Sequence, residues 1–446
     1  METKIINTSM GDIKCREYDD RIEIRGLRYA TAKRWEYPTP VDSWDGVYDA
    51  TEFGACSPQE RAFTNDEETA PFFYKEFREG QTFTYDEDCQ NLNITAPKDA
   101  KNCPVFIYIY GGAFVSGSAD EGYFGGDELA KEGIIWVAMN YRVSAYGFCS
   151  HPDLKDSEGK CGNYGLFDQL TAIQWVKDHI AEFGGDPNRI ILGGQSAGGM
   201  SVDLLLSTSQ LKKIGLKGAV LMSSAGIQRS IVKPKTPEKM KAFWDKVIEY
   251  AGKKNIFELR DETTDEEIYW AWNKAYQEGK IPLMNALPTY DGVLITKDNF
   301  KMSTVPTDIP MVVSVTSKDM FCIALLKMSQ AFVKKASRNG NKVWMANFAR
   351  QLPGDNAGPY HSSDIIYLFN RLDHNWRPFE DVDRKIANQM CKSICAFIKT
   401  GDPNCPEIPE WKVGRDMPMR FCEDSKMTPW DKKYMFDKTI HNDGPI

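Results

Sequence analysis

Short apolar runs and helix-like stretches alternate along the chain from residue 104 onward. The runs are rich in β-branched and aromatic residues, and the stretches between them have the spacing of helices that bury one face. The strand-like runs are 105–110, 134–141, 190–192, 218–222 and 311–315, with 342–347 as a further candidate, and 127–131 and 167–182 are helix-like. Strand followed by helix, repeated, predicts an α/β fold with a mostly parallel sheet flanked by helices.

The first 100 residues follow a different pattern. Strand-like pieces such as 22–24 are separated by turns and by Pro38, Pro40 and Pro58. We expect a small antiparallel sheet and a long covering loop here, not a separate domain. No Gly/Ser/Pro linker divides the chain, so residues 1–446 are predicted to form a single domain.

A charged segment at 232–280 interrupts the alternation of strands. It contains two helix-like stretches, 237–251 and 265–279, that carry Trp and Tyr among many charged residues. Insertions between strands of an open α/β sheet usually lie over the carboxyl ends of the strands, where such sheets bind ligands. We therefore expect this helical insertion near the active site.

Composition narrows the class of protein. The chain has 446 residues with 55 Lys plus Arg against 63 Asp plus Glu, a net charge of −8 that offers no basic surface for nucleic acid. No apolar run approaches the roughly 18 residues that span a bilayer. The first residues lack the basic and apolar pattern of a secretory signal, so a cytoplasmic location is expected. The 11 cysteines include no C-x-x-C pair, which argues against a zinc ribbon or a disulfide scaffold.

The strongest local motif is G-x-S-x-G at 194–198. It follows an apolar strand and opens a helix at 200–206, which is the context of a nucleophile elbow. Gly194 and Gly198 leave room for a turn so tight that side chains there would collide, and the Ser196 hydroxyl is then exposed. A glycine-rich turn without chemistry is the alternative interpretation.

A serine nucleophile needs a base, and the chain has only five histidines: His151, His179, His361, His374 and His441. His179 falls inside a helix and His441 near the end, which favours surface positions for both. The order serine, acid, histidine leaves His361 and His374. His361 lies in a turn-rich loop, 358–364, suited to delivering an imidazole to a cleft, so it is the preferred base.

The base needs an orienting carboxylate. Asp319 directly follows the strand-like run 311–315, at the strand end where this group belongs. A structural role for Asp319, capping a helix N-terminus, is the alternative. Asp291 and Asp364 are the competing carboxylates.

An acyl-transfer site also needs donors for the oxyanion. The loop Gly111-Gly112-Ala113 directly follows a strand, and its small residues let backbone amides approach a substrate oxygen. The amide of Ala197, just after the serine, would join them. An ordinary glycine turn is the alternative.

Several further motifs resemble the type-B carboxylesterase family, which includes cholinesterases and bacterial esterases and has the α/β-hydrolase fold. The similar segments are 26–30 (G-L-R-Y-A), 44–50 (W-D-G-V-Y-D-A), 87–94 (E-D-C-Q-N-L-N-I), 140–142 (N-Y-R), 165–169 (G-L-F-D-Q) and 400–404 (T-G-D-P-N) followed by Trp411. The resemblance spans nearly the whole chain. It implies a serine esterase that acts on small-molecule carboxylic esters through an acyl-enzyme, without a metal or an organic cofactor.

By this resemblance Ser196 is the nucleophile, His361 the base and Asp319 the acid. Gly111, Gly112, Ala113 and Ala197 form the oxyanion hole. The chain departs from the family where Asp319 replaces the usual Glu and where Gln195 replaces a Glu that often precedes the nucleophile.

The resemblance leaves three questions open. Cys56 and Cys89 occupy positions that commonly form a disulfide in the family, and here we expect neighbouring thiols. Amidase or feruloyl-type esterase specificity and a catalytically inactive binding protein are the alternative functions. The sequence leaves the oligomeric state open.

Overall fold

Strands form the centre of the structure, a computed structural model that describes residues 2–59, 71–77, 79–230, 233–279, 285–298, 300, 307–320 and 322–430. The strands are β1 (Glu2–Thr8), β2 (Gly11–Glu17), β3 (Arg21–Arg28), β4 (Ala30–Thr31), β5 (Thr39–Pro40), β6 (Val47–Asp49), β7 (Asn91–Pro97), β8 (Cys103–Ile109), β9 (Ile135–Met139), β10 (Gly185–Gln195), β11 (Gly218–Met222), β12 (Met311–Thr316), β13 (Val343–Phe348), β14 (Gly414–Phe421) and β15 (Lys426–Met427).

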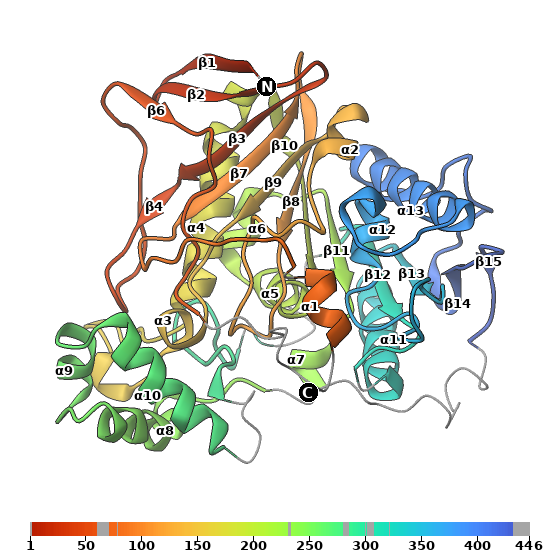
Figure 1. Ribbon diagram of the computed structural model, residues 1–446. Helices are drawn as coiled ribbons and strands as arrows, with labels where there is room; N and C mark the ends of the chain where they lie inside the picture. Colours follow the sequence, from red (N-terminus) through yellow and green to blue (C-terminus); the bar gives the residue numbers. More distant parts are fainter. Residues whose placement is uncertain are drawn as a thin grey trace.

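Helices surround these strands (Figure 1). They are α1 (Pro71–Phe77), α2 (Asp127–Lys131), α3 (Ser144–Phe148), α4 (Tyr164–His179), α5 (Ala197–Leu205), α6 (Ser209–Ile214), α7 (Ile227–Ser230), α8 (Pro237–Tyr250), α9 (Ile256–Asp261), α10 (Asp265–Gln277), α11 (Cys322–Arg338), α12 (Ile365–Leu368) and α13 (Asp381–Thr400). The short 3-10 helices are η1 (Pro152–Leu154), η2 (Ile180–Phe183) and η5 (Leu372–His374).

Within the described residues one 13-stranded sheet has the order β1-β2-β3-β7-β9-β8-β10-β11-β12-β13-β14-β15, with β6 beside β2. From β9 to β14 neighbouring strands are parallel, and the outer strands β1–β3, β7 and β15 pair antiparallel. Every residue of β9, β11, β12 and β13 is buried, as expected of parallel strands covered on both faces. The predicted α/β fold, a mostly parallel sheet flanked by helices, is confirmed.

The N-terminal strands extend this large sheet. β3 pairs antiparallel with β7 and carries β2 and β1 outward, while the separate antiparallel sheet is the small β4–β5 pair. The covering loop between β4 and β5 contacts a buried ion pair. The Arg142 guanidinium donates to Asp168 from Nε (2.8 Å) and Nη2 (2.7 Å), and Nη1 reaches the carbonyl oxygens of Lys33 and Glu36. The motifs at 140–142 and 165–169 therefore meet in one charge-assisted contact.

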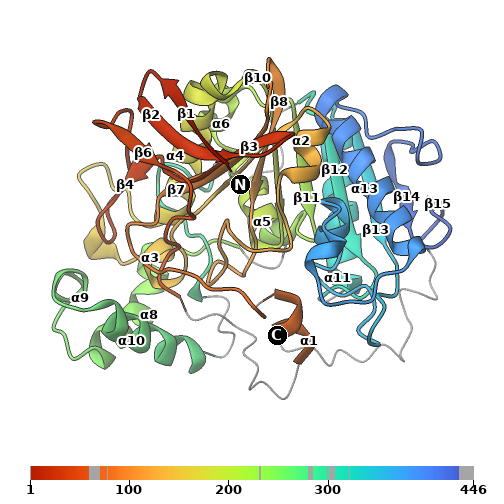
Figure 2. The same cartoon turned by 45° about the horizontal axis from the view of Figure 1, so that its top comes forward.

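Within the segment 232–280, residues 237–277 contain α8, α9 and α10, which agrees with the helix-like stretches predicted there. Its apolar faces build a second hydrophobic cluster around Trp244 and Trp272, which Trp35 and Ala145 of α3 complete. Figures 1 and 2 both show these three helices grouped at one end of the molecule, with α11 and α13 at the other. Direct contact with α3 fixes the insertion to the rest of the protein.

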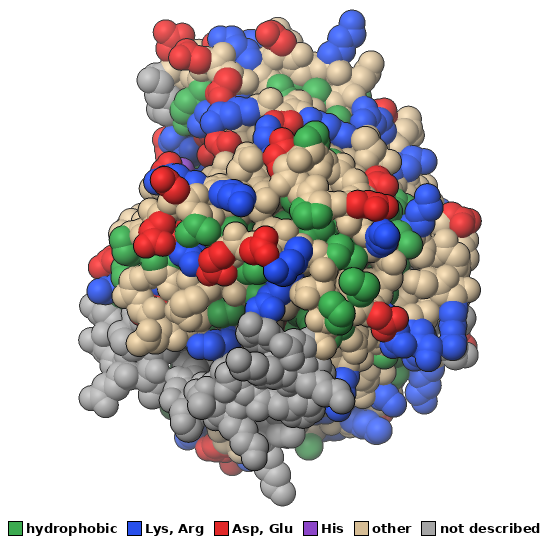
Figure 3. All heavy atoms as spheres, turned by 90° about the vertical axis from the view of Figure 1, so that its right-hand side faces the viewer, with side chains coloured by type: hydrophobic (Ala, Val, Ile, Leu, Met, Phe, Trp, Pro, Cys, Tyr) green, Lys and Arg blue, Asp and Glu red, His purple; other side chains and the backbone are tan. Residues whose placement is uncertain are grey.

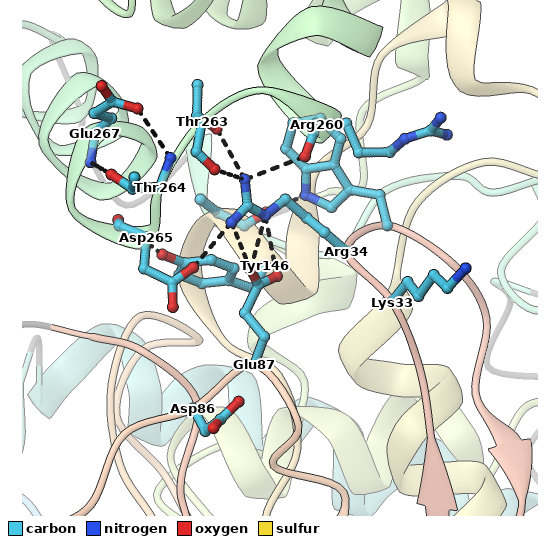
Figure 4. Close-up of polar contacts among 12 residues, drawn as sticks. Lys33, Arg34, Asp86, Glu87, Tyr146, Arg260, Thr263, Thr264, Asp265 and Glu267 are labelled. Atoms are coloured by element: carbon cyan, nitrogen blue, oxygen red, sulfur yellow. Dashed lines mark hydrogen bonds and ion pairs between the residues drawn. The ribbon is translucent and has the colours of Figure 1, made fainter.

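Arg34 ties the start of α10 to the N-terminal part of the chain (Figure 4). Its guanidinium donates to both carboxylate oxygens of Glu87 and to Asp265 Oδ1 at 2.9 Å. It also donates to the carbonyl oxygens of Arg260 (3.2 Å) and Thr263 (2.9 Å), at the end of α9 and the following turn. Burial, together with the neighbouring Asp265, raises the pKa of Glu87 to about 7 in spite of Arg34.

The surface carries both signs of charge. On the face drawn in Figure 3, acidic and basic side chains are interspersed, without a large area of one sign. In the part of the chain that the structure describes, no helix has the length and apolar character needed to cross a membrane. The cytoplasmic location stays a prediction.

Candidate active site

Ser196 lies at the sharp turn between β10 and α5. Its backbone has φ 52° and ψ −126°, a conformation that residues with a Cβ rarely adopt. The turn has no room for side chains at the flanking glycines: a Cβ at Gly194 would lie 2.5 Å from the carbonyl carbon of Gly198, and one at Gly198 would lie 2.0 Å from Ile109 O. The motif therefore has the geometry of a nucleophile elbow, because the turn that requires its glycines is present.

Asp319 follows β12 and is 2% exposed. Its Oδ2 accepts from the Thr316 backbone N (3.2 Å), from Thr316 Oγ1 (3.0 Å) and from Ser223 Oγ. Its Oδ1 accepts from the Met320 backbone N at 2.9 Å and faces His361 Nδ1 at 2.5 Å. The carboxylate is thus held by four donors besides the imidazole.

The loop that carries His361 is attached to the Asp319 loop through the backbone. Lys318 and Tyr360 form a parallel β-bridge, and Lys318 N donates to Pro359 O at 2.9 Å. These contacts set the imidazole against Asp319. Burial acts to lower the pKa of His361, but the charge and hydrogen bond of Asp319, with a smaller effect of Asp364, raise it above its usual value.

His361 Nε2, the nitrogen that faces away from Asp319, contacts the elbow. It lies 3.1 Å from Nε2 of Gln195, the residue before the serine. Ser196 itself is half-buried, and its hydroxyl makes no hydrogen bond to any residue that the structure describes. The structure thus brings Asp319, His361 and the elbow together, with the Gln195 amide at the nitrogen that a serine base would use.

The Gly111-Gly112-Ala113 loop lies against the elbow. A Cβ at Gly111 would be 3.0 Å from Ser196 Cβ, and one at Gly112 would be 2.1 Å from Ser116 O. Ala113 has φ 55°, unusual for alanine. Among the described residues, the backbone N–H groups of Gly112, Ala113 and Ala197 donate to no acceptor, and such unpaired donors beside a serine suit an oxyanion.

The competing carboxylates have other partners. Asp291 accepts from the backbone N of Val293 (2.8 Å) and Ile295 (3.1 Å), and so holds a turn. Asp364, the last residue of the loop 358–364, is completely buried. Its Oδ2 accepts from Ser314 Oγ at 3.3 Å, and its Oδ1 has no partner among the described residues. Burial, with a contribution from Asp319, raises the pKa of Asp364 to about 7.

The other histidines lie elsewhere. His151 is buried and contacts Asp245 (Nε2 to Oδ1, 3.4 Å), and His374 ends η5, where burial and Arg371 lower its pKa. His179, at the end of α4, is half-buried beside Asp42 and Glu182, and His441 lies outside the described residues.

Sequence reasoning missed the residues that hold Asp319. Ser223 directly follows β11, is completely buried and has φ 49°, and its N–H donates to Ser314 O at 2.8 Å. The available signal was its position: a polar residue at the carboxyl end of the strand next to β12 faces whatever follows β12. No group of three or more His, Cys, Asp or Glu side chains suited to a metal ion occurs within the described ranges. Cys56 and Cys89 are both buried, and Cys56 Sγ donates to Thr84 O at 3.4 Å.

The chain matches known proteins over most of its length. The model of the Carboxylesterase family matches residues 2–338 and 325–434. The chain belongs to the carboxylesterase family. It is 33% identical to the para-nitrobenzyl esterase of Bacillus subtilis over 472 residues, covering 92% of each protein. It is also 41% identical to the fumonisin B1 esterase of Sphingopyxis macrogoltabida over 196 residues, which are 43% of this chain and 33% of that protein.

Solved structures show the same fold. A PNB esterase aligns with a TM-score of 0.81 at 22% identity, covering 97% of this chain and 98% of that one. A carboxylesterase of Geobacillus stearothermophilus aligns with a TM-score of 0.78 at 24% identity, covering 97% and 99%. This carboxylesterase thus has the α/β-hydrolase fold. Its family and its identity to the para-nitrobenzyl esterase show that it hydrolyses carboxylic esters.

Proposed function

We propose that this carboxylesterase hydrolyses small-molecule esters in two steps through a Ser196–His361–Asp319 triad. The observation that carries the proposal is the convergence of two loops on the elbow. Asp319 Oδ1 lies 2.5 Å from His361 Nδ1, and the opposite nitrogen of the imidazole reaches Gln195, next to Ser196. Contacts of this kind are often incomplete without substrate and close when it binds.

In the first step Ser196 Oγ attacks the ester carbonyl carbon while His361 Nε2 takes the hydroxyl proton. The backbone amides of Gly112, Ala113 and Ala197 donate to the oxyanion, and Asp319 stabilises the imidazolium. His361 then protonates the leaving alcohol oxygen as the C–O bond breaks, which leaves an acyl-serine. Water, deprotonated by His361, attacks the acyl carbon. The bond to Ser196 Oγ then breaks, Oγ takes the proton back from His361, and the acid is released.

We also infer that the insertion 232–280 borders this site within the single domain. α3 connects the two regions: Ser144 N donates to Phe114 O at 2.7 Å, and the Phe114 and Phe148 rings lie 5.0 Å apart, next to the proposed oxyanion loop. On its other side, Tyr146 OH donates to Asp265 O at 3.1 Å, at the start of α10. α3 thus contacts both the insertion and the loop that carries the Gly112 and Ala113 amides.

Ser196→Ala tests the proposal directly. We expect hydrolysis of p-nitrophenyl acetate and butyrate to fall about a thousandfold or more. A fluorophosphonate probe should label wild-type protein at Ser196 by mass spectrometry, whereas Ser209→Ala, a change at the exposed start of α6, should leave both results unchanged. Undiminished hydrolysis by Ser196→Ala, or labelling elsewhere, would contradict the assignment.

A further inference from the structure

Gln195 occupies a place between two parts of the proposed machinery. The residue is 2% exposed, and its side-chain amide nitrogen lies 3.1 Å from His361 Nε2. Its amide oxygen lies against the oxyanion loop, because a Cβ at Gly111 would come within 2.7 Å of it. The amide nitrogen therefore contacts the base, and the amide oxygen lies beside Gly111.

The direction of the hydrogen bond between Gln195 and His361 follows from the other side of the ring. Thr316, Ser223 and Met320 all donate to Asp319, so His361 Nδ1 donates to it as well. In the neutral imidazole the proton then resides on Nδ1, and Nε2 is an acceptor with one lone pair. The Gln195 amide is thus the donor to Nε2.

This lone pair is the one that has to accept the proton of Ser196. In the structure the Gln195 amide occupies it, and Ser196 Oγ makes no hydrogen bond to a described residue. We propose, building on the triad above, that Gln195 is a positioning residue that caps His361 Nε2 in the resting site and releases it before Ser196 transfers its proton. The structure is then the capped state of the base.

The cap has a consequence for the charge of the imidazole. A donor to Nε2 favours the neutral ring, whereas a carboxylate favours the protonated one. The charges that act on His361 among the described residues are Asp319, which follows β12, and Asp364, on its own loop. Gln195 comes from the third element packed against the ring, the elbow, and it opposes both carboxylates.

Two variants of Gln195 separate these effects. Gln195→Met keeps the length of the side chain but cannot donate, so the titration midpoint of His361 should rise. Gln195→Glu adds a carboxylate beside Nε2. In this variant the titration midpoint of His361 should rise further, by about one pH unit or more above wild type. Gln277→Glu, an exposed position near the end of α10, makes the same charge change away from the site and is the matched control.

The direct measurement is ¹⁵N NMR of histidine-labelled protein across pH, without substrate. The chain has only five histidines, and the signal lost in His361→Gln identifies the imidazole. We expect the order wild type, Gln195→Met, Gln195→Glu, with Gln277→Glu equal to wild type. If Gln195→Glu does not fold, Gln195→Met still tests the cap. A wild-type midpoint in the folded Gln195 variants would overturn the proposal.

Kinetics test the release of the cap. The acid limb of kcat/KM reports the free base, so it should move with the NMR midpoint, and a shift of one pH unit lowers kcat/KM about tenfold below the limb. An acid limb that stays in place while the NMR midpoint moves would overturn the link between Gln195 and catalysis. Because the NMR signal is read without substrate, failure of the proposed ester hydrolysis would be recognised separately, as absent turnover in the wild type.

Discussion

Asp319 and Ser196 lie at opposite ends of the proposed triad, and their surroundings differ. The Asp319 carboxylate accepts from Thr316, Ser223 and Met320 in addition to His361. Ser196 Oγ and the amides of Gly112, Ala113 and Ala197 have no partner among the described residues, and several of them lie in a strained backbone. The Asp319 carboxylate, which only orients the base, has a full set of hydrogen-bond donors. The groups that would contact the substrate have donors and acceptors that no described residue occupies.

Removing the charge of Asp319 should have the largest effect on activity. Asp319→Asn keeps the size of the side chain but no longer stabilises the imidazolium, and an amide donor at Nδ1 favours the wrong tautomer. We expect kcat to fall about 10⁴-fold in an assay with p-nitrophenyl butyrate. Asp373→Asn, an exposed position in η5, is the control. Loss of activity in both variants, or in neither, would contradict the comparison.

A substitution in the proposed oxyanion loop should reduce activity by moving the backbone. Gly112→Ala places a Cβ 2.1 Å from Ser116 O, so the loop has to move and its amides leave the oxyanion. We expect kcat to fall about 10² to 10³-fold while fluorophosphonate still labels Ser196 slowly.

The matched control for that variant is Gly46→Ala. Gly46 also has a positive φ, +76°, but a Cβ there meets nothing within 4 Å, so it reports conformational strain without a collision. Its activity should equal that of the wild type. Full activity of the Gly112→Ala variant would contradict the assignment of the oxyanion donors to this loop.

The smallest expected effect concerns Asp364, a buried residue of the His361 loop whose Oδ1 has no partner among the described residues. Its pKa, raised to about 7 by burial and Asp319, lies above the unfolded value of 3.8. The folded state therefore binds its proton more tightly, and this contribution to stability is lost as pH rises from about 4 through 7. Asp364→Asn should flatten the fall of Tm over this range.

The same variant removes a charge that raises the pKa of His361, so the acid limb of kcat/KM should move to lower pH by less than one unit, with kcat above the limb changed no more than a few-fold. Thermal unfolding and kcat/KM, each measured from pH 4 to 8.5, check both expectations. A Tm profile parallel to that of wild type would show that Asp364 is already ionised at low pH.

Local rules predicted much of the site. The run 218–222 is β11 residue for residue, and the segment around Ser196 forms the elbow because strand, glycines and helix all agree on one turn. The position of Asp319 after a strand and of His361 in a turn-rich loop predicts both as candidates. Why Asp319 and not Asp291 faces His361 follows from contacts between distant segments, such as the bridge between Lys318 and Tyr360.

Strand patterns and glycine turns are local properties, so the amino-acid sequence is enough to predict the α/β fold, the nucleophile elbow and a short set of candidate histidines and carboxylates. Three relations appear only in the folded protein: Ser223 donates to Asp319, Asp364 Oδ1 has no partner among the described residues, and Gln195 caps His361. These relations depend on strand order and register, which bring residues 195, 223, 319 and 361 to the same end of the sheet.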